Sequence, residues 1–531
     1  MLQHVGSFLR AVTGNLVRLK LDELFYKIFM YKSYRTPQEK FLSTDYMEQY
    51  SFVEGNVSKI GMSINDICAL LCSGISSVIG TMILFWQNEP WLLLYTLIIS
   101  ISALFLNKYT SKKEYELNKT QIKNQREHNY YKGILTDKNY GKELRIYKVQ
   151  AHIVSIWNKL HEELRLERLT LELKHIKLRN IYTIVKTALR IVAMAFLLVG
   201  VINKRYDLGT FVMLFGLVDI CSNQINSLAY QVMSGVYKNM QYLNDYYDFI
   251  SPITNAEIMS IRKGEEERLT EQEFVSLEAK HVSFTYPQKK MPAVNDVCFK
   301  LNKGEIVSIL GYNGSGKTTF AKLLTGALSP THGQILFNGE PVTRENCYAK
   351  YFSFGILLQE YSRFSVSIRE YVGLGSIKQM QDDALVQSAL QKANAVKLID
   401  TYNERERTIL GKAYDENGVD LSGGEWQRLA IASAYMGEPP VYVLDEPTAS
   451  IDPLLEAEML SQFRKNIDGK TAILISHRIG FARLADRIIL MENGRIIESG
   501  SHEELLSANG KYAKMFNEQK SLYEAGLSYE K

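Results

Sequence analysis

Cysteine is scarce in this chain of 531 residues, and what the sequence lacks excludes several kinds of protein. The five cysteines form no Cys-x-x-Cys pair, so we interpret them as small hydrophobic residues rather than as a disulfide framework or a metal site. The first 20 residues have no long apolar segment and no small-residue cleavage site, so we expect no secretory signal there. A formal net charge of +4 is too small for this length to indicate a nucleic-acid partner.

Long apolar segments occur only in the first 230 residues, and a chain of this length needs at least two domains. A membrane-spanning helix takes roughly 20 mostly apolar residues. A buried helix of a soluble protein would show a polar face about every 3.6 residues, and residues 67–106 show none apart from the short link QNEP. We therefore predict an all-α transmembrane domain over residues 1–250, with spans at about 67–86, 91–106, 183–202 and 208–228.

The segment between the two predicted hairpins, residues 107–182, is rich in lysine and arginine, which favours the cytoplasmic side of a membrane. It has helical periodicity and little glycine or proline. We expect two long helices that extend the spans into the cytosol, and a separate soluble subdomain is the alternative. An even number of spans would leave both ends of the chain on the cytoplasmic side.

Three charged residues, Lys186, Arg190 and Asp219, fall in or near the later spans. Ionisable groups at membrane depth usually face the protein interior or a water-filled cavity. One interpretation is that Lys186 and Arg190 line a translocation cavity and favour an anionic or carboxylate-bearing cargo. The interpretation that we prefer is that they extend to the cytoplasmic surface or pair with Asp219.

Residues 251–275 contain Pro252, Gly264 and a run of charged side chains, and we predict a linker there. Strand and helix patterns alternate after this linker, without another long apolar segment. A second domain of mixed strands and helices is therefore expected from residue 276 to residue 531.

The strongest motif of this second domain follows a short apolar segment that predicts a buried strand. Gly311-Tyr-Asn-Gly-Ser-Gly316-Lys317-Thr318 matches the phosphate-binding pattern G-x-x-x-x-G-K-[ST], and a helical pattern follows. In such a loop backbone N–H groups wrap the phosphates, Lys317 reaches the β- and γ-phosphates, and Thr318 offers a hydroxyl to Mg²⁺. The residues expected to hold the nucleotide are Gly311, Asn313, Gly314, Ser315, Gly316, Lys317, Thr318 and Thr319.

A second motif, PPVYVLDEPTAS, ends another strand that no polar residue interrupts. Its Asp445 is placed to hold Mg²⁺, and Glu446 is placed to polarise the water that attacks the γ-phosphate. Adjacent acidic residues that only serve solubility are the alternative, which fits poorly directly after a buried strand.

The segment LSGGEWQRLAIASA, residues 421–434, resembles the signature motif of ABC ATPases, a motif nearly specific to that family. The resemblance covers residues 276–517 and, more loosely, the membrane half. It implies an α/β P-loop NTPase domain with a helical subdomain, in which two such domains enclose two ATP molecules head to tail.

The resemblance also assigns roles to residues that alone would more often be structural. It makes Gln359 and His477 catalytic alongside Glu446, because Gln359 would contact Mg²⁺ and water and His477 the γ-phosphate. The other assignments are adenine stacking by Tyr286, communication across the dimer by Asp452, and closure on the ATP of the other subunit by Ser422, Gly423 and Gly424.

Two positions depart from the family pattern. Glutamine most often follows the two signature glycines, whereas this chain has Glu425, which could pair with Arg428. Residues 415–418 match the Glu-Arg-Gly-like stretch of exporters only in part. We still predict a competent ATPase, because the catalytic glutamate and the switch histidine are both present.

Spans that precede one nucleotide domain resemble exporters. The resemblance therefore implies ATP-driven export across the cell membrane, with Mg²⁺ and with the nucleotide domain in the cytoplasm. The working unit would be a dimer with a second half-transporter, identical or different. The signature region is similar to that of exporters of ribosomally made, lantibiotic-like compounds, which makes a peptide the candidate cargo.

Half-transporters of this family usually carry more spans than the four found here. We expect that the start is truncated, with the first span and most of the second lacking, and a partner that supplies helices is the alternative. An inactive truncated transporter and a membrane regulator or immunity protein that binds ATP without transport are competing interpretations. Soluble ABC proteins that act on DNA or ribosomes form another class, and the apolar hairpins argue against it.

Overall fold

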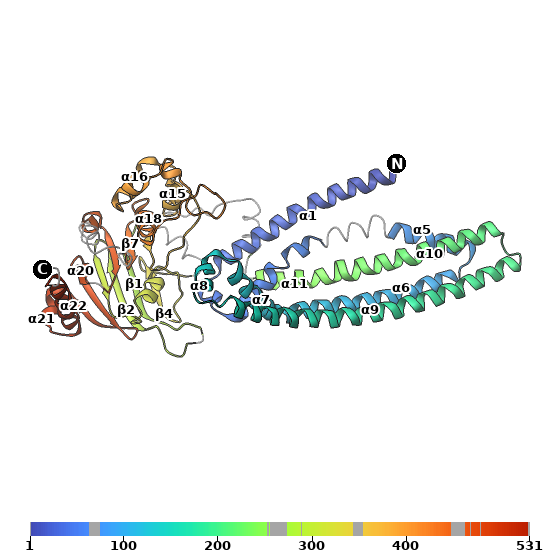
Figure 1. Ribbon diagram of the computed structural model, residues 1–531, viewed down its shortest axis with the longest axis horizontal. Coiled ribbons are helices and arrows are strands. Elements are labelled where there is room, and N and C mark those ends of the chain that lie inside the picture. The colour runs from blue at the N-terminus through green and yellow to red at the C-terminus, as the bar shows by residue number, and fades with distance from the viewer. Residues whose placement is uncertain are drawn as a thin grey trace. The chain divides into compact units, whose positions relative to one another are not determined.

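The computed structural model divides the chain into two compact units, one helical and one of mixed sheets and helices (Figure 1). The helical unit comprises Met1–Thr36 and Lys40–Glu266, and the mixed unit comprises Pro37–Glu39 and Glu267–Lys531. Most of the predicted linker lies outside the described residues. The structure describes the chain except for residues 1, 63–74, 252–253, 255–272, 288, 344–353, 448–461, 468, 478 and 529–531.

Three helices of the described helical unit pack on one another: α6 (Leu92–Thr120), α9 (Gln150–Ile202) and α10 (Leu208–Tyr230). They run side by side (Figure 1). A π-helical segment, η3 (Gln231–Tyr237), and α11 (Lys238–Ile250) continue α10 without a break. The other described elements are α1 (Leu2–Arg35), α2 (Gln38–Phe41), α3 (Thr44–Glu54), α5 (Ile75–Asn88), α7 (Ile122–Thr136), η2 (Lys138–Tyr140) and α8 (Gly141–Ile146).

The long helices have the composition of membrane spans. Among the described residues, α6, α9 and the continuous helix from Leu208 to Ile250 are long and apolar enough to cross a bilayer. Large side chains such as Leu94 and Phe196 are 65% and 64% exposed on them, which is favourable only against lipid or another apolar surface. The predicted spans from residue 91 onward fall in these helices. Only the later part of the first predicted span is described, as α5.

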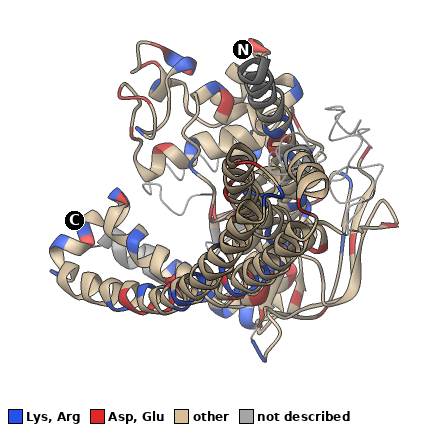
Figure 2. Cartoon of the chain, turned by 90° about the vertical axis from the view of Figure 1, so that its right-hand side faces the viewer, with Lys and Arg blue, Asp and Glu red and all other residues tan. Residues whose placement is uncertain are grey.

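Charged side chains are distributed along the helices differently from apolar side chains. Both α6 and α9 extend well beyond their apolar parts, so residues 107–182 are largely helical, as expected. Figure 2 shows Lys and Arg interspersed with Asp and Glu rather than gathered in one patch of a single sign. This distribution agrees with the small net charge.

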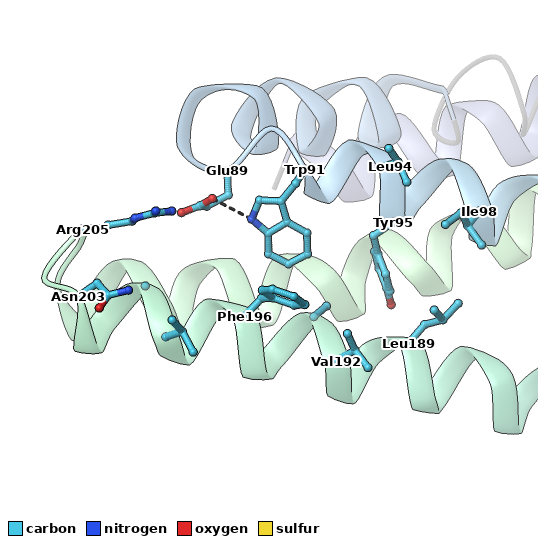
Figure 3. A pocket seen from close by; sticks show the side chains of 13 residues that line it. Glu89, Trp91, Leu94, Tyr95, Ile98, Leu189, Val192, Phe196, Asn203 and Arg205 are labelled. Atoms are coloured by element: carbon cyan, nitrogen blue, oxygen red, sulfur yellow. Dashed lines mark hydrogen bonds between the residues drawn. The ribbon is translucent and has the colours of Figure 1, made fainter.

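A pocket of about 590 Å³ lies between α6 and α9, near the turns that end α5 and α9. Its walls are apolar, with Leu94, Ile98, Val192 and Phe196 among them, and Figure 3 shows Glu89 and Arg205 at one end. The Trp91 indole donates a hydrogen bond of 2.8 Å to the Glu89 carboxylate. The pocket is a gap between α6 and α9, which pack against each other elsewhere.

The mixed unit contains two sheets. The four-stranded sheet is antiparallel with the order β2-β1-β4-β5, and the six-stranded sheet has the order β10-β9-β3-β8-β7-β6, in which only the β10–β9 pair is antiparallel. The strands are β1 (Ser276–Phe284), β2 (Val294–Asn302), β3 (Ile306–Leu310), β4 (His332–Phe337), β5 (Glu340–Pro341), β6 (Phe354–Leu357), β7 (Val441–Asp445), β8 (Thr471–Ile475), β9 (Arg487–Glu492) and β10 (Arg495–Gly500).

The central parallel strands position the site. Strands β3, β7 and β8 are buried almost throughout, as continuous apolar runs in a covered parallel sheet require. Because neighbouring parallel strands end at the same sheet edge, the loops after these three strands meet there. The phosphate-loop motif follows β3, and the motif of Asp445 and Glu446 lies at the end of β7.

A helical subdomain packs around Tyr371, Leu390, Trp426 and Leu429, which are buried together. The predicted fold class, an all-α transmembrane domain plus an α/β P-loop domain with a helical subdomain, is confirmed. Of the cysteines that the structure describes, Cys221 is buried and Cys298 is exposed on β2. The helices of the mixed unit are α13 (Lys317–Leu324), α15 (Ile368–Gly373), η4 (Ile377–Gln379), α16 (Asp383–Lys392), α17 (Val396–Ile399), η5 (Arg405–Arg407), α18 (Gly423–Tyr435), α20 (Ile479–Ala482), α21 (His502–Ser507) and α22 (Lys511–Ser528).

Candidate functional site

The predicted phosphate loop connects β3 to α13 and is pressed against neighbouring backbone. Gly311 and Gly316 have φ angles of 152° and 102°, a region that favours glycine. A Cβ atom at Gly311 would lie 2.3 Å from the Met491 carbonyl oxygen, and one at Gly316 would lie 2.3 Å from the Ala293 carbonyl oxygen. Only glycine fits at these two positions, because any side chain would collide with the neighbouring backbone. The tip of the loop, at Asn313 and Gly314, is exposed and is therefore accessible to a ligand.

Lys317 begins α13 and is only 6% exposed. Its Nζ donates to the carbonyl oxygens of Gly311 and Tyr312 at 2.8 and 3.0 Å. Burial lowers the pKa of Lys317, and the nearby carboxylates of Glu446 and Asp445 oppose this shift. The ammonium group therefore lies inside the curve of the loop, where a bound phosphate would meet it.

The Ser315 side chain is another buried polar group of the loop. It is 6% exposed, and its Oγ has no hydrogen-bond partner within the described structure. A buried hydroxyl without a partner is costly unless a ligand satisfies it. This observation supports a ligand in the loop.

Asp445 ends β7 and is 1% exposed, and neither of its carboxylate oxygens has a hydrogen-bond partner of ordinary geometry among the described residues. Burial raises the pKa of Asp445 to about 6, and the neighbouring Thr318 hydroxyl and Lys317 ammonium oppose the rise. The Thr318 hydroxyl donates to Gln359 Oε1 at 3.5 Å. The three predicted metal residues thus bring a hydroxyl, an amide carbonyl and a carboxylate together, and this set of oxygen donors fits Mg²⁺.

Glu446 follows Asp445 and is the centre of a hydrogen-bond network. Its Oε2 accepts from Gln359 Nε2 at 3.0 Å, and its Oε1 lies 3.0 Å from His477 Nδ1. Its φ of 49° is unusual for a residue with a side chain, and such backbone strain is concentrated at functional sites. Of the three residues predicted to be catalytic, Gln359 and His477 therefore both contact Glu446.

Two glutamines that the motifs did not identify support this network. Gln427 is 3% exposed, and its Nε2 donates to the Glu446 carbonyl at 3.2 Å. Gln519 Nε2 donates to the His477 carbonyl at 2.7 Å. Gln427 lies inside the signature motif, between Trp426 and Arg428, whereas nothing in the sequence around Gln519 marks it.

Tyr286 lies beside the start of α13. Its hydroxyl is 3.2 Å from Thr319 Oγ1, and its ring packs edge-on against Phe284 with the ring centroids 4.9 Å apart. The aromatic residue predicted to stack on adenine is therefore adjacent to the phosphate loop.

The signature motif starts α18. Ser422 is the N-cap, and Gly423 and Gly424 form the first turn. Glu425 Oε2 accepts from the Ser422 backbone N–H at 2.7 Å, and Ser422 Oγ accepts from the Glu425 N–H at 3.4 Å, which together form a capping box. The suggested pairing of Glu425 with Arg428 is wrong, because the helix geometry turns Arg428 toward the Asn394 carbonyl, 3.4 Å away.

The structure brings the predicted residues together in two groups. The phosphate loop, Asp445, Glu446, Gln359 and His477 form one group. The signature residues form the other, and in the part of the chain that is described no hydrogen bond joins Ser422 to the phosphate loop. A cavity of about 300 Å³ lies beside the first group and is lined by Gln359, Tyr361, Gln427, Asp445 and Glu446, among others. Asp452 lies outside the described residues.

Comparison with known proteins finds relatives for both units. Residues 294–449 match the family model described as ABC transporter. The subtilin transport ATP-binding protein SpaT of Bacillus subtilis is 27% identical over 496 residues, which cover 93% of this chain and 79% of that protein. The nisin transport ATP-binding protein NisT of Lactococcus lactis subsp. lactis is 25% identical over 426 residues, covering 79% and 69%. A bacterial Atm1-family ABC exporter with ATP bound has a similar fold, with a TM-score of 0.79 and 19% identity over 97% of this chain and 87% of that chain.

Proposed function

Because this chain is an ABC transporter whose nucleotide-binding domain is fused to a membrane domain, we propose that it exports a cargo across the cytoplasmic membrane by hydrolysing ATP at Glu446. The observation that carries the proposal is the position of Glu446. Its carboxylate lies between Gln359 and His477, at the sheet edge where the phosphate loop begins after β3. We assign residues 1–250 to the membrane domain, 251–275 to a linker and 276–531 to the nucleotide-binding domain.

Nucleotide binding would use the loop and its lysine. The backbone N–H groups of residues 311–316 and the N-terminus of α13 favour phosphate oxygens, and the Lys317 ammonium would leave its two carbonyl partners for the β- and γ-phosphates. Thr318, Gln359 and Asp445 would hold the Mg²⁺ that accompanies ATP, and the chemistry that this ion supplies is neutralisation of phosphate charge. Tyr286 would stack on the adenine.

Hydrolysis would start from a water molecule beside Glu446. The carboxylate would polarise the water and accept its proton as the oxygen attacks the γ-phosphorus and the bond to the β-phosphate oxygen breaks, which yields ADP and phosphate. His477 would donate to the γ-phosphate, and Gln359 would orient the water. The Glu446 side chain is only 12% exposed. This suits the role of a base, because few other water molecules can reach the carboxylate and compete with the attacking water.

We propose that two chains act together in the membrane. Within the described residues the signature group is not joined to the phosphate loop, and Ser422, Gly423 and Gly424 would instead close on ATP held by a second half-transporter. Asp452 would communicate across this interface. The second half-transporter would be either an identical copy or a related chain.

A peptide is the cargo that we propose. Two relatives that match most of this chain are named for the transport of subtilin and of nisin. The signature region is similar to that of exporters of ribosomally made compounds. Both observations point in the same direction, and neither specifies the peptide.

The test is ATP hydrolysis by the purified chain in lipid nanodiscs. Glu446→Gln should lower hydrolysis by about 100-fold or more while ATP still binds, because the loop remains and only the base is lost. Lys317→Ala should abolish ATP binding as well. Glu503→Gln, an exposed glutamate at the start of α21, is the control and should hydrolyse ATP like the parent.

If Glu446→Gln and Lys317→Ala both hydrolysed ATP as fast as the parent, the proposed site would be wrong. A parent that binds ATP in vesicles but moves no peptide with ATP or with a nonhydrolysable analogue would favour the regulator interpretation.

A further inference from the structure

Polar side chains join α9 to α10 within the part of both helices that is otherwise apolar. Three such pairs follow one another at intervals of about one helical turn, and we name them the polar ladder. The ladder consists of Tyr182 Oη to Asn226 Oδ1 at 2.5 Å, Lys186 Nζ to Asn223 Oδ1 at 3.3 Å and Arg190 Nη2 to Asp219 Oδ2 at 2.6 Å.

The ladder lies inside the membrane rather than at its outer surface. Arg190 and Lys186 come about 13 and about 17 residues before the turn that ends α9, which at about 1.5 Å per residue is about 20 and about 25 Å along the helix. The hydrocarbon core of a bilayer is about 30 Å thick. The pairs of Arg190 and Lys186 therefore fall in the inner half of the bilayer, and Tyr182, about 21 residues and about 31 Å from the same turn, falls at its inner edge.

The charged groups of the ladder are not enclosed by their own chain. The Arg190 and Asp219 side chains are 37% and 34% exposed, and Asn223 is also exposed. Charged groups cannot face lipid tails at this depth without a large cost, so this side of α9 and α10 faces either water or protein within the membrane. An exporter needs a water-filled path at this depth.

The charges of the ladder do not cancel. The Asp219 carboxylate forms an ion pair with Arg190 and neutralises its charge. The pairing with Asp219 that we preferred from the sequence is therefore confirmed for Arg190. Lys186 instead donates to the neutral amide oxygen of Asn223. The ladder thus keeps one positive charge at Lys186, an ammonium with three N–H donors next to an exposed amide.

We propose that Lys186 and Asn223 form an anion-binding position in the export path and select cargo that carries a carboxylate group. This inference rests on the proposed export function. One ammonium and one amide NH₂ match the charge and the two oxygens of a carboxylate, whereas a phosphate would require more donors. Arg190 and Asp219 join the neighbouring turn of both helices and give the position polar surroundings.

The experiment measures binding to the full chain in lipid nanodiscs without ATP. The probes are two dansylated pentapeptides of alternating leucine and alanine, one with a free C-terminal carboxylate and one with a C-terminal amide, and fluorescence anisotropy reports binding. The free acid should bind about tenfold or more tightly than the amide, because one charge-assisted contact distinguishes the two. Lys186→Gln should reduce this ratio to about one, and Lys186→Arg should restore it.

Lys177→Gln is the matched control, because Lys177 is an exposed lysine of the same helix outside its apolar part, and its ratio should equal that of the parent. The thermal unfolding midpoint of Lys186→Gln should stay close to that of the parent, which shows that the variant is folded. An unchanged ratio in Lys186→Gln would overturn the inference, as would displacement of the free acid by excess inorganic phosphate. Dissociation of the dimer in Lys186→Gln would overturn it too, because Lys186 would then be an interface residue.

Failure of the inference and failure of the proposed function are distinguishable. If Glu446→Gln loses hydrolysis as expected while the ratio of the two peptide affinities is unchanged in Lys186→Gln, only the cargo-binding position is wrong. If the ratio depends on Lys186 while Glu446→Gln still hydrolyses ATP, the binding position remains and the proposed ATPase site is wrong.

Discussion

At the scale of single residues, the position of Glu446 is set by backbone as much as by side-chain contacts. Its N–H donates to the Ile475 carbonyl of β8 at 2.9 Å, and its own carbonyl accepts from Gln427. A left-handed φ at a non-glycine residue costs about 1–3 kcal/mol, so the contacts on both sides of the peptide must offset that cost. The carboxylate is consequently held in place before any nucleotide arrives.

The phosphate loop permits a sharp test at Gly316. Gly316→Ala would place a Cβ 2.3 Å from the Ala293 carbonyl oxygen at a φ of 102°, so the loop would have to move. We expect loss of ATP binding and a fall in stability of at least about 1–3 kcal/mol. ATP binding to the purified chain and its thermal unfolding midpoint are the measurements.

Gly304 provides the matched control for that substitution. Its φ is 79°, and a Cβ there meets no atom within 4 Å, so Gly304→Ala carries the backbone strain without the collision. We expect Gly304→Ala to lose some stability and to keep ATP binding. Equal ATP binding by the two alanine variants would show that the loop is less constrained than its contacts indicate.

At the scale of elements, the start of α18 explains the departure from the family pattern at Glu425. The residue stands at the third position of the helix, where its carboxylate completes the capping box with Ser422 and also lies favourably in the helix dipole. The same geometry is available to glutamine. The substitution therefore preserves the local structure of the signature motif.

Two substitutions at Glu425 separate capping from charge. Glu425→Ala removes one half of the box and should lower stability by about 0.5–2 kcal/mol, whereas Glu425→Gln should stay within about 0.5 kcal/mol of the parent. We expect Glu425→Gln to hydrolyse ATP at nearly the parent rate. Chemical unfolding of the purified chain and its ATPase rate are the measurements, and an alanine variant as stable as the parent would contradict the capping role.

At the scale of the whole molecule, the membrane orientation makes a prediction about two exposed positions. Asn203 ends α9 at a turn that the proposed orientation puts outside the cell, and Cys298 is exposed in the mixed unit. In intact cells a membrane-impermeant thiol reagent should label Asn203→Cys, and it should label Cys298 only after permeabilisation. Each measurement uses a chain whose other cysteines are replaced by serine.

The Cys298→Ser chain without any cysteine is the control for background labelling. Labelling of Cys298 in intact cells would place the nucleotide-binding domain outside, where ATP is scarce, and would contradict the proposed orientation. Equal labelling of Asn203→Cys before and after permeabilisation is the result that supports it.

Much of the architecture follows from short-range pattern in the sequence. The apolar segments before the phosphate loop and before Asp445 predict buried strands because only a covered parallel sheet accommodates them, and β3 and β7 are those strands. The apolar lengths of α6, α9 and α10 likewise predict membrane helices, because the thickness of a bilayer sets the number of residues. Such features depend on neighbours a few residues apart, which a sequence displays directly.

The tertiary structure alone decided which distant side chains meet. Gln427 and Gln519 support Glu446 and His477 from helices far along the chain, and Arg428 takes the Asn394 carbonyl instead of Glu425. In the membrane half, only the packing of α9 on α10 neutralises Arg190 and leaves the charge of Lys186. Residue types and spacing identified the ATP chemistry because it depends on local loops, whereas pairings across elements depend on helix rotation and packing, which no local pattern encodes.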